Sequence, residues 1–115
     1  MDRNWVASIL RDACGHARVP HQDFINGVLA GLEVGRKQYG EFAYRGRNNN
    51  KEGRYEARDC AAYALMEMAD MQEEYKEGKV DEQVMAMSQQ HLLQVVVMAA
   101  QIDQHFALAR HYRLS

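Results

Sequence analysis

Apolar residues recur every three to four positions in four stretches of the chain, a spacing that predicts four α-helices. The predicted helices span about residues 3–14, 21–39, 54–76 and 82–112, and a loop covers residues 40–53. Gly15, Pro20 and Gly78 lie between the apolar stretches, at places where helices commonly end or begin. We therefore predict an all-α fold, a four-helix bundle-like arrangement formed by one domain of residues 1–115.

The fourth predicted helix is the most apolar part of the chain, and residues 95–100 are apolar on every side of it. At 1.5 Å per residue this helix would be roughly 45 Å long, more than one small bundle can cover. Gly27, Gly31 and Gly35 repeat at every fourth position of the second predicted helix, a pattern that favours close approach of another helix. We therefore expect a homo-oligomer.

Composition narrows the possible locations and partners. The net charge of −2 gives no reason to expect a nucleic-acid or membrane partner. No uninterrupted apolar run approaches the roughly 18 residues of a membrane span. The two cysteines, Cys14 and Cys60, are isolated in the sequence and suit a reducing compartment, so we predict a cytoplasmic protein.

A ladder of acidic residues is the strongest chemical signal in the sequence. Its members follow one another at steps of three or four residues and share one side of the third predicted helix, with Tyr63 among them: Glu56, Asp59, Glu67, Asp70 and Glu74. Carboxylates one turn apart are suitable ligands for Mg²⁺, which prefers oxygen ligands and keeps waters or phosphates in its shell. The alternative is a solvated helix face, or a ladder neutralised by arginines.

The ladder contains two pairs of acids with the same spacing. Glu56 and Asp59 form one E-x-x-D pair, and Glu67 and Asp70 form the other. The pairs are 11 residues apart, which is about 16 Å along a helix, so one chain cannot place both on the same ion.

The segment 36–58 is basic and aromatic. It holds seven basic and three acidic residues, a local charge of +4 in a chain of net charge −2. Guanidinium groups bind phosphate and aromatic rings stack on bases, so the segment has the chemistry of a nucleotide-binding loop. We predict that phosphates are held by Arg36, Lys37, Arg45, Arg47 and Arg54, and that Tyr39 or Tyr44 stacks on the base. The alternative is a solvated loop whose arginines partly neutralise the acidic ladder.

The run Gly35-Arg36-Lys37-Gln38-Tyr39-Gly40-Glu41, followed after a loop by Glu56-Ala57-Arg58-Asp59 and Tyr63, resembles phage-type members of the all-α nucleoside triphosphate pyrophosphatases. This is the MazG-like and dimeric dUTPase-like group. The resemblance covers about residues 24–75. It implies an oligomeric helical bundle in which Mg²⁺, held by helix carboxylates, activates water to cleave a nucleotide into its monophosphate and pyrophosphate.

The chain departs from that family at one acidic pair. The family supplies an E-x-x-E pair from an earlier helix, whereas this chain has Glu33 there, with Arg36 in place of the second acid. Either Glu67 and Asp70 substitute, for instance from a neighbouring subunit, or the protein binds nucleotides without hydrolysing them.

The sequence thus leads to two functional hypotheses. The first is a Mg²⁺-dependent nucleoside triphosphate pyrophosphohydrolase, in which Glu56 and Asp59 bind the metal and Glu67 and Asp70 add metal ligation or a general base. The second is a non-catalytic, small phage-like binding protein that sequesters a nucleotide or inhibits a host protein. A purely structural assembly protein would have no nucleotide affinity at all.

Overall fold

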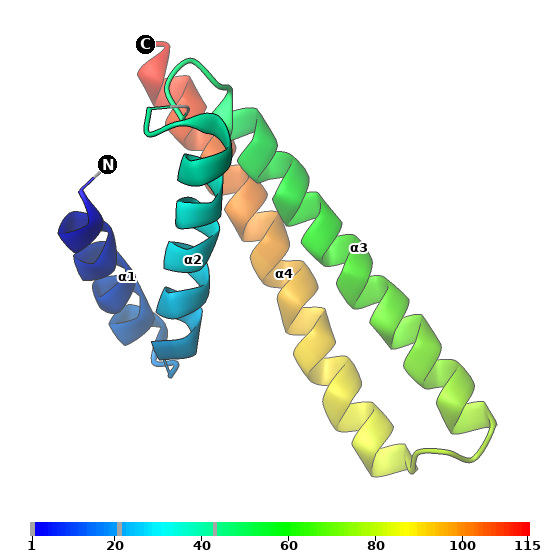
Figure 1. The fold of residues 1–115 in the computed structure, drawn as a ribbon. Helices are drawn as coiled ribbons and strands as arrows, with labels where there is room; N and C mark the ends of the chain where they lie inside the picture. The colour runs from blue at the N-terminus through cyan, green and yellow to red at the C-terminus, as the bar shows by residue number, and fades with distance from the viewer. Residues whose placement is uncertain (1, 21, 43) are drawn as a thin grey trace. The chain divides into compact units, whose positions relative to one another are not determined.

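The computed structural model describes residues 2–20, 22–42 and 44–115, and these residues form four helices (Figure 1). The helices are α1 (Arg3–Ala17), α2 (Gln22–Tyr39), α3 (Asn49–Lys76) and α4 (Glu82–Arg113). The described ranges contain no β-strand, and the prediction of an all-α protein is confirmed.

The chain divides into two compact units, Met1–Arg47 and Asn48–Ser115. Each unit is a helical hairpin: α1 and α2 run antiparallel in the first, and α3 and α4 run antiparallel in the second (Figure 1). The predicted association of all four helices in one domain, and of several chains in an oligomer, stays a prediction.

The first helix ends later than its sequence suggests. Asp2 caps its start, because the side-chain carboxylate accepts hydrogen bonds from the backbone N–H groups of Asn4 and Trp5. The predicted end was Cys14, before Gly15, but the helix continues to Ala17. The residue that takes the left-handed conformation is Arg18, with φ of 56°, so an arginine performs the role expected of the glycine.

The third helix begins at Asn49, and the prediction of a loop to residue 53 is wrong. Asn48 caps α3, because its side-chain oxygen accepts a hydrogen bond from the backbone N–H of Lys51 at 3.1 Å. Gly53 therefore lies inside the helix, and its missing side chain makes room for the ring of Phe106 on α4. The basic loop is shortened to residues 40–48, and Lys51 and Arg54 belong to α3.

Three polar contacts set the register of α3 against α4. The side chain of Asn50 donates to the backbone oxygen of Phe106 at 2.7 Å, and Arg54 pairs with Asp103 at 2.9 Å. Gln89 donates to the backbone oxygen of Met68 at 2.9 Å. Because α3 and α4 are antiparallel, each step forward along α3 corresponds to one step backward along α4. Residue 63 of α3 therefore lies opposite about residue 94 of α4.

The core of this hairpin is thin and made of small side chains. Its buried residues are Ala57, Ala64 and Ala99, and no large side chain of the described chain is fully buried. Of the apolar residues 95–100, Ala99 is buried within the chain itself, whereas Val97 is 42 % and Met98 49 % exposed.

By length and composition alone, α4 could cross a membrane, and 6 % of its most apolar 18-residue window is buried inside the structure. Residues 83–102 carry no Asp, Glu, Lys or Arg. Gln, Ser and His residues interrupt this stretch, so it contains no uninterrupted apolar run of that length.

Candidate functional site

The acidic residues of α3 form an exposed stripe. We call Glu56, Asp59, Glu67, Asp70 and Glu74, with Tyr63, the acidic stripe. The two E-x-x-D pairs are exposed, and within the described chain none of their four carboxylates has a hydrogen bond or ion pair. Tyr63, which separates the two pairs, is 70 % exposed. Within the α3–α4 hairpin, these four acids are therefore not neutralised by arginines.

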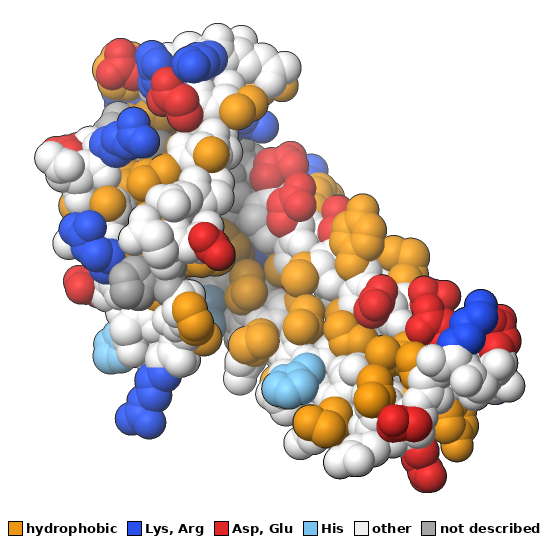
Figure 2. All heavy atoms as spheres, turned by 60° about the horizontal axis from the view of Figure 1, so that its bottom comes forward, with side chains coloured by type: hydrophobic (Ala, Val, Ile, Leu, Met, Phe, Trp, Pro, Cys, Tyr) orange, Lys and Arg blue, Asp and Glu red, His pale blue; other side chains and the backbone are white. Residues whose placement is uncertain are grey.

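The acidic stripe lies beside apolar surface rather than in a wholly polar setting. A shallow groove between α3 and α4 is lined by Glu67 and Met71 of α3 and by Val84, Met87, Ser88, His91 and Leu92 of α4. Figure 2 shows hydrophobic side chains gathered along this hairpin with acidic side chains beside them. Among the predicted metal and catalytic residues, Glu67 thus borders this groove.

Within the described residues, no three His, Cys, Asp or Glu side chains come together as a group that could hold a metal ion. A straight helix explains this, because it brings only two carboxylates together at a spacing of one turn. Mg²⁺ can be held by two carboxylates when waters and phosphates complete its shell, or when further carboxylates come from a second chain.

Of the predicted phosphate-binding residues, Arg36 pairs with Glu33 one turn earlier on α2. The Nη2–Oε1 distance is 2.6 Å, and Nε of Arg36 donates to the other oxygen at 3.0 Å. The hydrogen bond from Arg36 lowers the pKa of Glu33 and raises that of the guanidinium. Arg36 thus neutralises Glu33 on the same helix.

Arg54 lies on α3 and contacts α4 within the hairpin. Its Nε donates to Oδ1 of Asp103 at 2.9 Å, and Nε of Arg58 lies 3.4 Å from the same oxygen. The hydrogen bond from Arg54 is the main reason why the pKa of Asp103 lies below its ordinary value. The main contact of Arg54 therefore holds α3 against α4.

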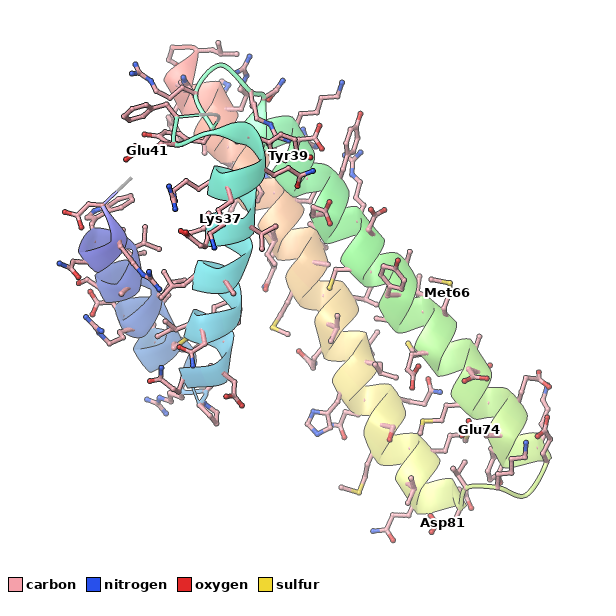
Figure 3. All side chains as sticks on the ribbon, viewed as in Figure 1. Lys37, Tyr39, Glu41, Met66, Glu74 and Asp81 are labelled. Atoms are coloured by element: carbon pink, nitrogen blue, oxygen red, sulfur yellow. The ribbon has the colours of Figure 1, made fainter. Side chains whose placement is uncertain are left out.

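Lys37 and Tyr39 lie at the end of α2 (Figure 3), and Tyr44, Arg45 and Arg47 follow in the loop after it. The guanidinium of Arg47 lies 5.9 Å from the ring centroid of Tyr39, a cation–π arrangement. The rings of Phe42 and Tyr44 contact each other with centroids 6.5 Å apart. Lys37 and Arg45 are exposed and have no ion pair among the residues that the structure describes.

Sequence reasoning overlooked Asp103, the partner of Arg54. A usable signal existed, since Asp103 is the single Asp, Glu, Lys or Arg between Gln83 and Ala109. An isolated charge in an otherwise uncharged helix usually has a partner on a packed neighbour, because leaving it unpaired against apolar surface is costly.

These features describe an all-α protein made of two helical hairpins, with an unneutralised acidic stripe on one of them. The chain matches no protein-family model, no curated protein and no solved structure. The resemblance to the all-α nucleoside triphosphate pyrophosphatases stays a prediction from sequence.

Proposed function

We propose that the protein is a Mg²⁺-dependent nucleoside triphosphate pyrophosphohydrolase that acts as an oligomer in the cytoplasm. The observation that supports this proposal is the exposed pair Glu56 and Asp59, one helical turn apart and without any partner in the described chain. Exposed carboxylates that face no cation of their own chain are available to a divalent ion that arrives with a nucleotide.

The two acidic pairs of α3 have different proposed roles. Glu56 and Asp59 bind Mg²⁺, which in such a site lowers the pKa of water and offsets the charge of the phosphates. Glu67 and Asp70 lie three helical turns away, so they add metal ligation or a general base from a neighbouring subunit. Mg²⁺ is the cofactor and a nucleotide the substrate.

The basic residues differ in how readily they can contact phosphate. Lys37 and Arg45 are without ion pairs in the described structure, so they are the first candidates. Arg47 reaches a phosphate by leaving the face of Tyr39, which then becomes free to stack on a base, with Tyr44 as the other candidate ring. Arg36 and Arg54 contribute only by breaking their carboxylate pairs.

A second candidate is a non-catalytic binding protein that sequesters a nucleotide or inhibits a host protein. The observation favouring it is that Arg36 and Arg54 are occupied by Glu33 and Asp103. Such a protein retains its nucleotide affinity in EDTA, and that affinity depends on Arg45 and Arg47. Hydrolysis of the nucleotide, in contrast, requires Mg²⁺.

Thermal unfolding against a panel of nucleotides, with Mg²⁺ and with EDTA, tests both candidates. Ligand at 100 times its dissociation constant stabilises a protein by about 2.7 kcal/mol, which is several degrees for a domain of this size. Stabilisation that requires Mg²⁺ supports the hydrolase, and stabilisation that persists in EDTA supports sequestration. No stabilisation by any nucleotide contradicts both.

Pyrophosphate release then identifies the residues. Asp59→Asn should abolish release of pyrophosphate, because an amide is a poor ligand for Mg²⁺. Glu73→Gln is the matched control, since Glu73 lies on the same helix but outside the acidic stripe and should leave turnover unchanged. Equal turnover in Asp59→Asn and in the unchanged protein would refute the assignment.

A further inference from the structure

One flank of α4 carries a second row of uncovered side chains. We call Val84, Met87, His91, Val95, Met98, Ile102 and His105 the α4 row. Their steps of three or four residues place them on one side of the helix, next to the side that packs on α3. Val84, Met87, Met98 and Ile102 are 45–55 % exposed. An apolar row of this length on a helix face usually contacts another helix.

The α4 row and the acidic stripe lie on the same side of the hairpin. The groove between the helices shows this, because Glu67 of the acidic stripe and Val84, Met87 and His91 of the α4 row all line it. This side of the hairpin is therefore one continuous surface, acidic along α3 and apolar along α4.

Both rows are symmetric about the same level of the hairpin. On α3, Asp59 and Glu67 lie four residues either side of Tyr63, and Glu56 and Asp70 lie seven residues either side. On α4, six members of the row form three pairs that are equidistant from a point between Gln94 and Val95, and the seventh member, Val95, lies next to that point. The register of the hairpin places residue 63 opposite about residue 94. The midpoint of the acidic stripe's two pairs and the midpoint of the α4 row therefore lie at the same level of the hairpin.

We propose that this surface binds the same surface of a second copy of the chain, across a twofold axis that passes through Tyr63 and between Gln94 and Val95. The axis makes each helix antiparallel to its counterpart and brings together residues of the two copies in these pairs: Val84 with His105, Met87 with Ile102, His91 with Met98, Glu56 with Asp70, and Asp59 with Glu67. The two hairpins then form a four-helix bundle with an apolar α4–α4 seam.

The surface is large enough for a stable dimer. The 28 residues of α3 span about 42 Å, and two packed helices are about 20 Å wide with their side chains. Their product is about 800 Å² for each copy, the size of a standard protein–protein interface. The apolar half of this area also explains why α4 is so thinly covered within its own chain.

The acidic half of the interface rests on the proposed function, because facing carboxylates repel one another without a cation. In the dimer, Glu56 and Asp59 of one copy meet Asp70 and Glu67 of the other, at two equivalent places. Mg²⁺ at these places would favour the dimer, and EDTA should weaken it. The α4–α4 seam does not depend on Mg²⁺.

Analytical ultracentrifugation of the full chain tests the pairing of the α4 row. Met87→Glu and Ile102→Lys, each alone, put an unpaired charge into the seam and should weaken dimerisation about 100-fold. The double variant pairs the new charges between copies and should restore most of the affinity. Because positions 87 and 102 are four turns apart on one helix, the rescue cannot arise within a single chain.

Leu93→Glu is the matched control, because Leu93 is 51 % exposed on the opposite flank of α4. It should leave the dimer intact. A monomer at all protein concentrations, failure of the double variant to regain affinity, or greater sensitivity to Leu93→Glu would each overturn the proposal.

Disulfide formation tests the position of the axis on α3. In a Cys60→Ser background, Tyr63→Cys places two cysteines at the axis and should give a covalent dimer on mild oxidation. Met66→Cys is the control, because Met66 is 57 % exposed and points away from α4 (Figure 3). Equal cross-linking of both variants would contradict the register.

These experiments separate the interface from the proposed function. A dimer with this register but no nucleotide affinity would refute the hydrolase and keep the α4–α4 interface. Pyrophosphate release by a protein that stays monomeric would support the hydrolase and refute the α4–α4 interface.

Discussion

Two contacts at the open end of the α3–α4 hairpin depend on single residues. The ring of Phe106 fills the space that Gly53 leaves. Arg54 pairs with Asp103, which lies one turn before Phe106 on α4. Asn50 adds its hydrogen bond to the backbone of Phe106. Together these side chains determine the register on which the symmetry of the hairpin surface depends.

Gly53→Ala should destabilise the protein by about 1–3 kcal/mol, because the added methyl group overlaps the Phe106 ring and forces it to move. Urea unfolding followed by circular dichroism measures the change. Gly31→Ala is the control: no described atom lies within 4 Å of its added methyl group, so the higher helix propensity of alanine should stabilise α2. Equal effects of the two substitutions would contradict the packing of Phe106 on Gly53. Within the first hairpin, no atom of α1 lies within 4 Å of a methyl group added at Gly27, Gly31 or Gly35.

Stability should fall at acidic pH because of Asp103. Its pKa is lowered below the ordinary value of 3.8 by Arg54, so the folded state holds the proton more weakly than the unfolded state. The resulting stabilisation is fully present above the ordinary pKa and is lost as pH falls through the lower, folded value. The difference in unfolding free energy between the unchanged protein and Asp103→Asn should therefore shrink below about pH 4.

At the level of elements, both helices of the second hairpin begin at a side-chain cap. Asn48 caps α3, and Asp81 caps α4 by accepting a hydrogen bond from the backbone N–H of Val84 at 2.8 Å. The short connection between α3 and α4 turns at Gly78, whose φ of +75° suits glycine. These local signals hold the ends of helices whose buried side chains are mostly alanine.

Asp81→Ala should cost about 0.5–2 kcal/mol of stability, because the N–H of Val84 loses its acceptor and the negative charge at the helix start is removed. Asp81→Asn keeps the acceptor and should cost less. Urea unfolding of the two variants compares them, and an equal loss in both would show that the hydrogen bond is not what stabilises this end.

At the scale of the whole molecule, the chain leaves much apolar surface uncovered. Four large hydrophobic residues of the α4 row, Val84, Met87, Met98 and Ile102, are 45–55 % exposed. Monomeric proteins rarely leave contiguous apolar patches of this kind, so the surface is better explained by association than by isolation.

The thermal midpoint should therefore rise with protein concentration, as it does when unfolding is coupled to dissociation. Scanning calorimetry over a hundredfold range of concentration measures this dependence. Met87→Glu should reduce it while leaving the midpoint at the lowest concentration nearly unchanged. A midpoint independent of concentration in the unchanged protein would contradict association of any kind.

The sequence by itself determined the helices, because helix formation depends on hydrogen bonds and side-chain spacing within a few residues. The starts at Asp2 and Asp81 and the shared side of the acidic residues follow from the same local rules. Local rules do not determine whether the acidic side chains of α3 are exposed and unpaired, because their spacing alone also allowed arginines to neutralise them. These side chains are Glu56, Asp59, Glu67 and Asp70.

Tertiary structure alone decided what depends on residues distant in sequence. The start of α3 at Asn49, the pairing of Arg54 with Asp103 and the position of Glu67 in a groove beside α4 all require the hairpin to form. Gly53 read as a loop residue because its helical role is visible only with Phe106, 53 positions later in the chain, packed against it. Local patterns report which elements form, whereas long-range packing determines which side chains those elements bring together.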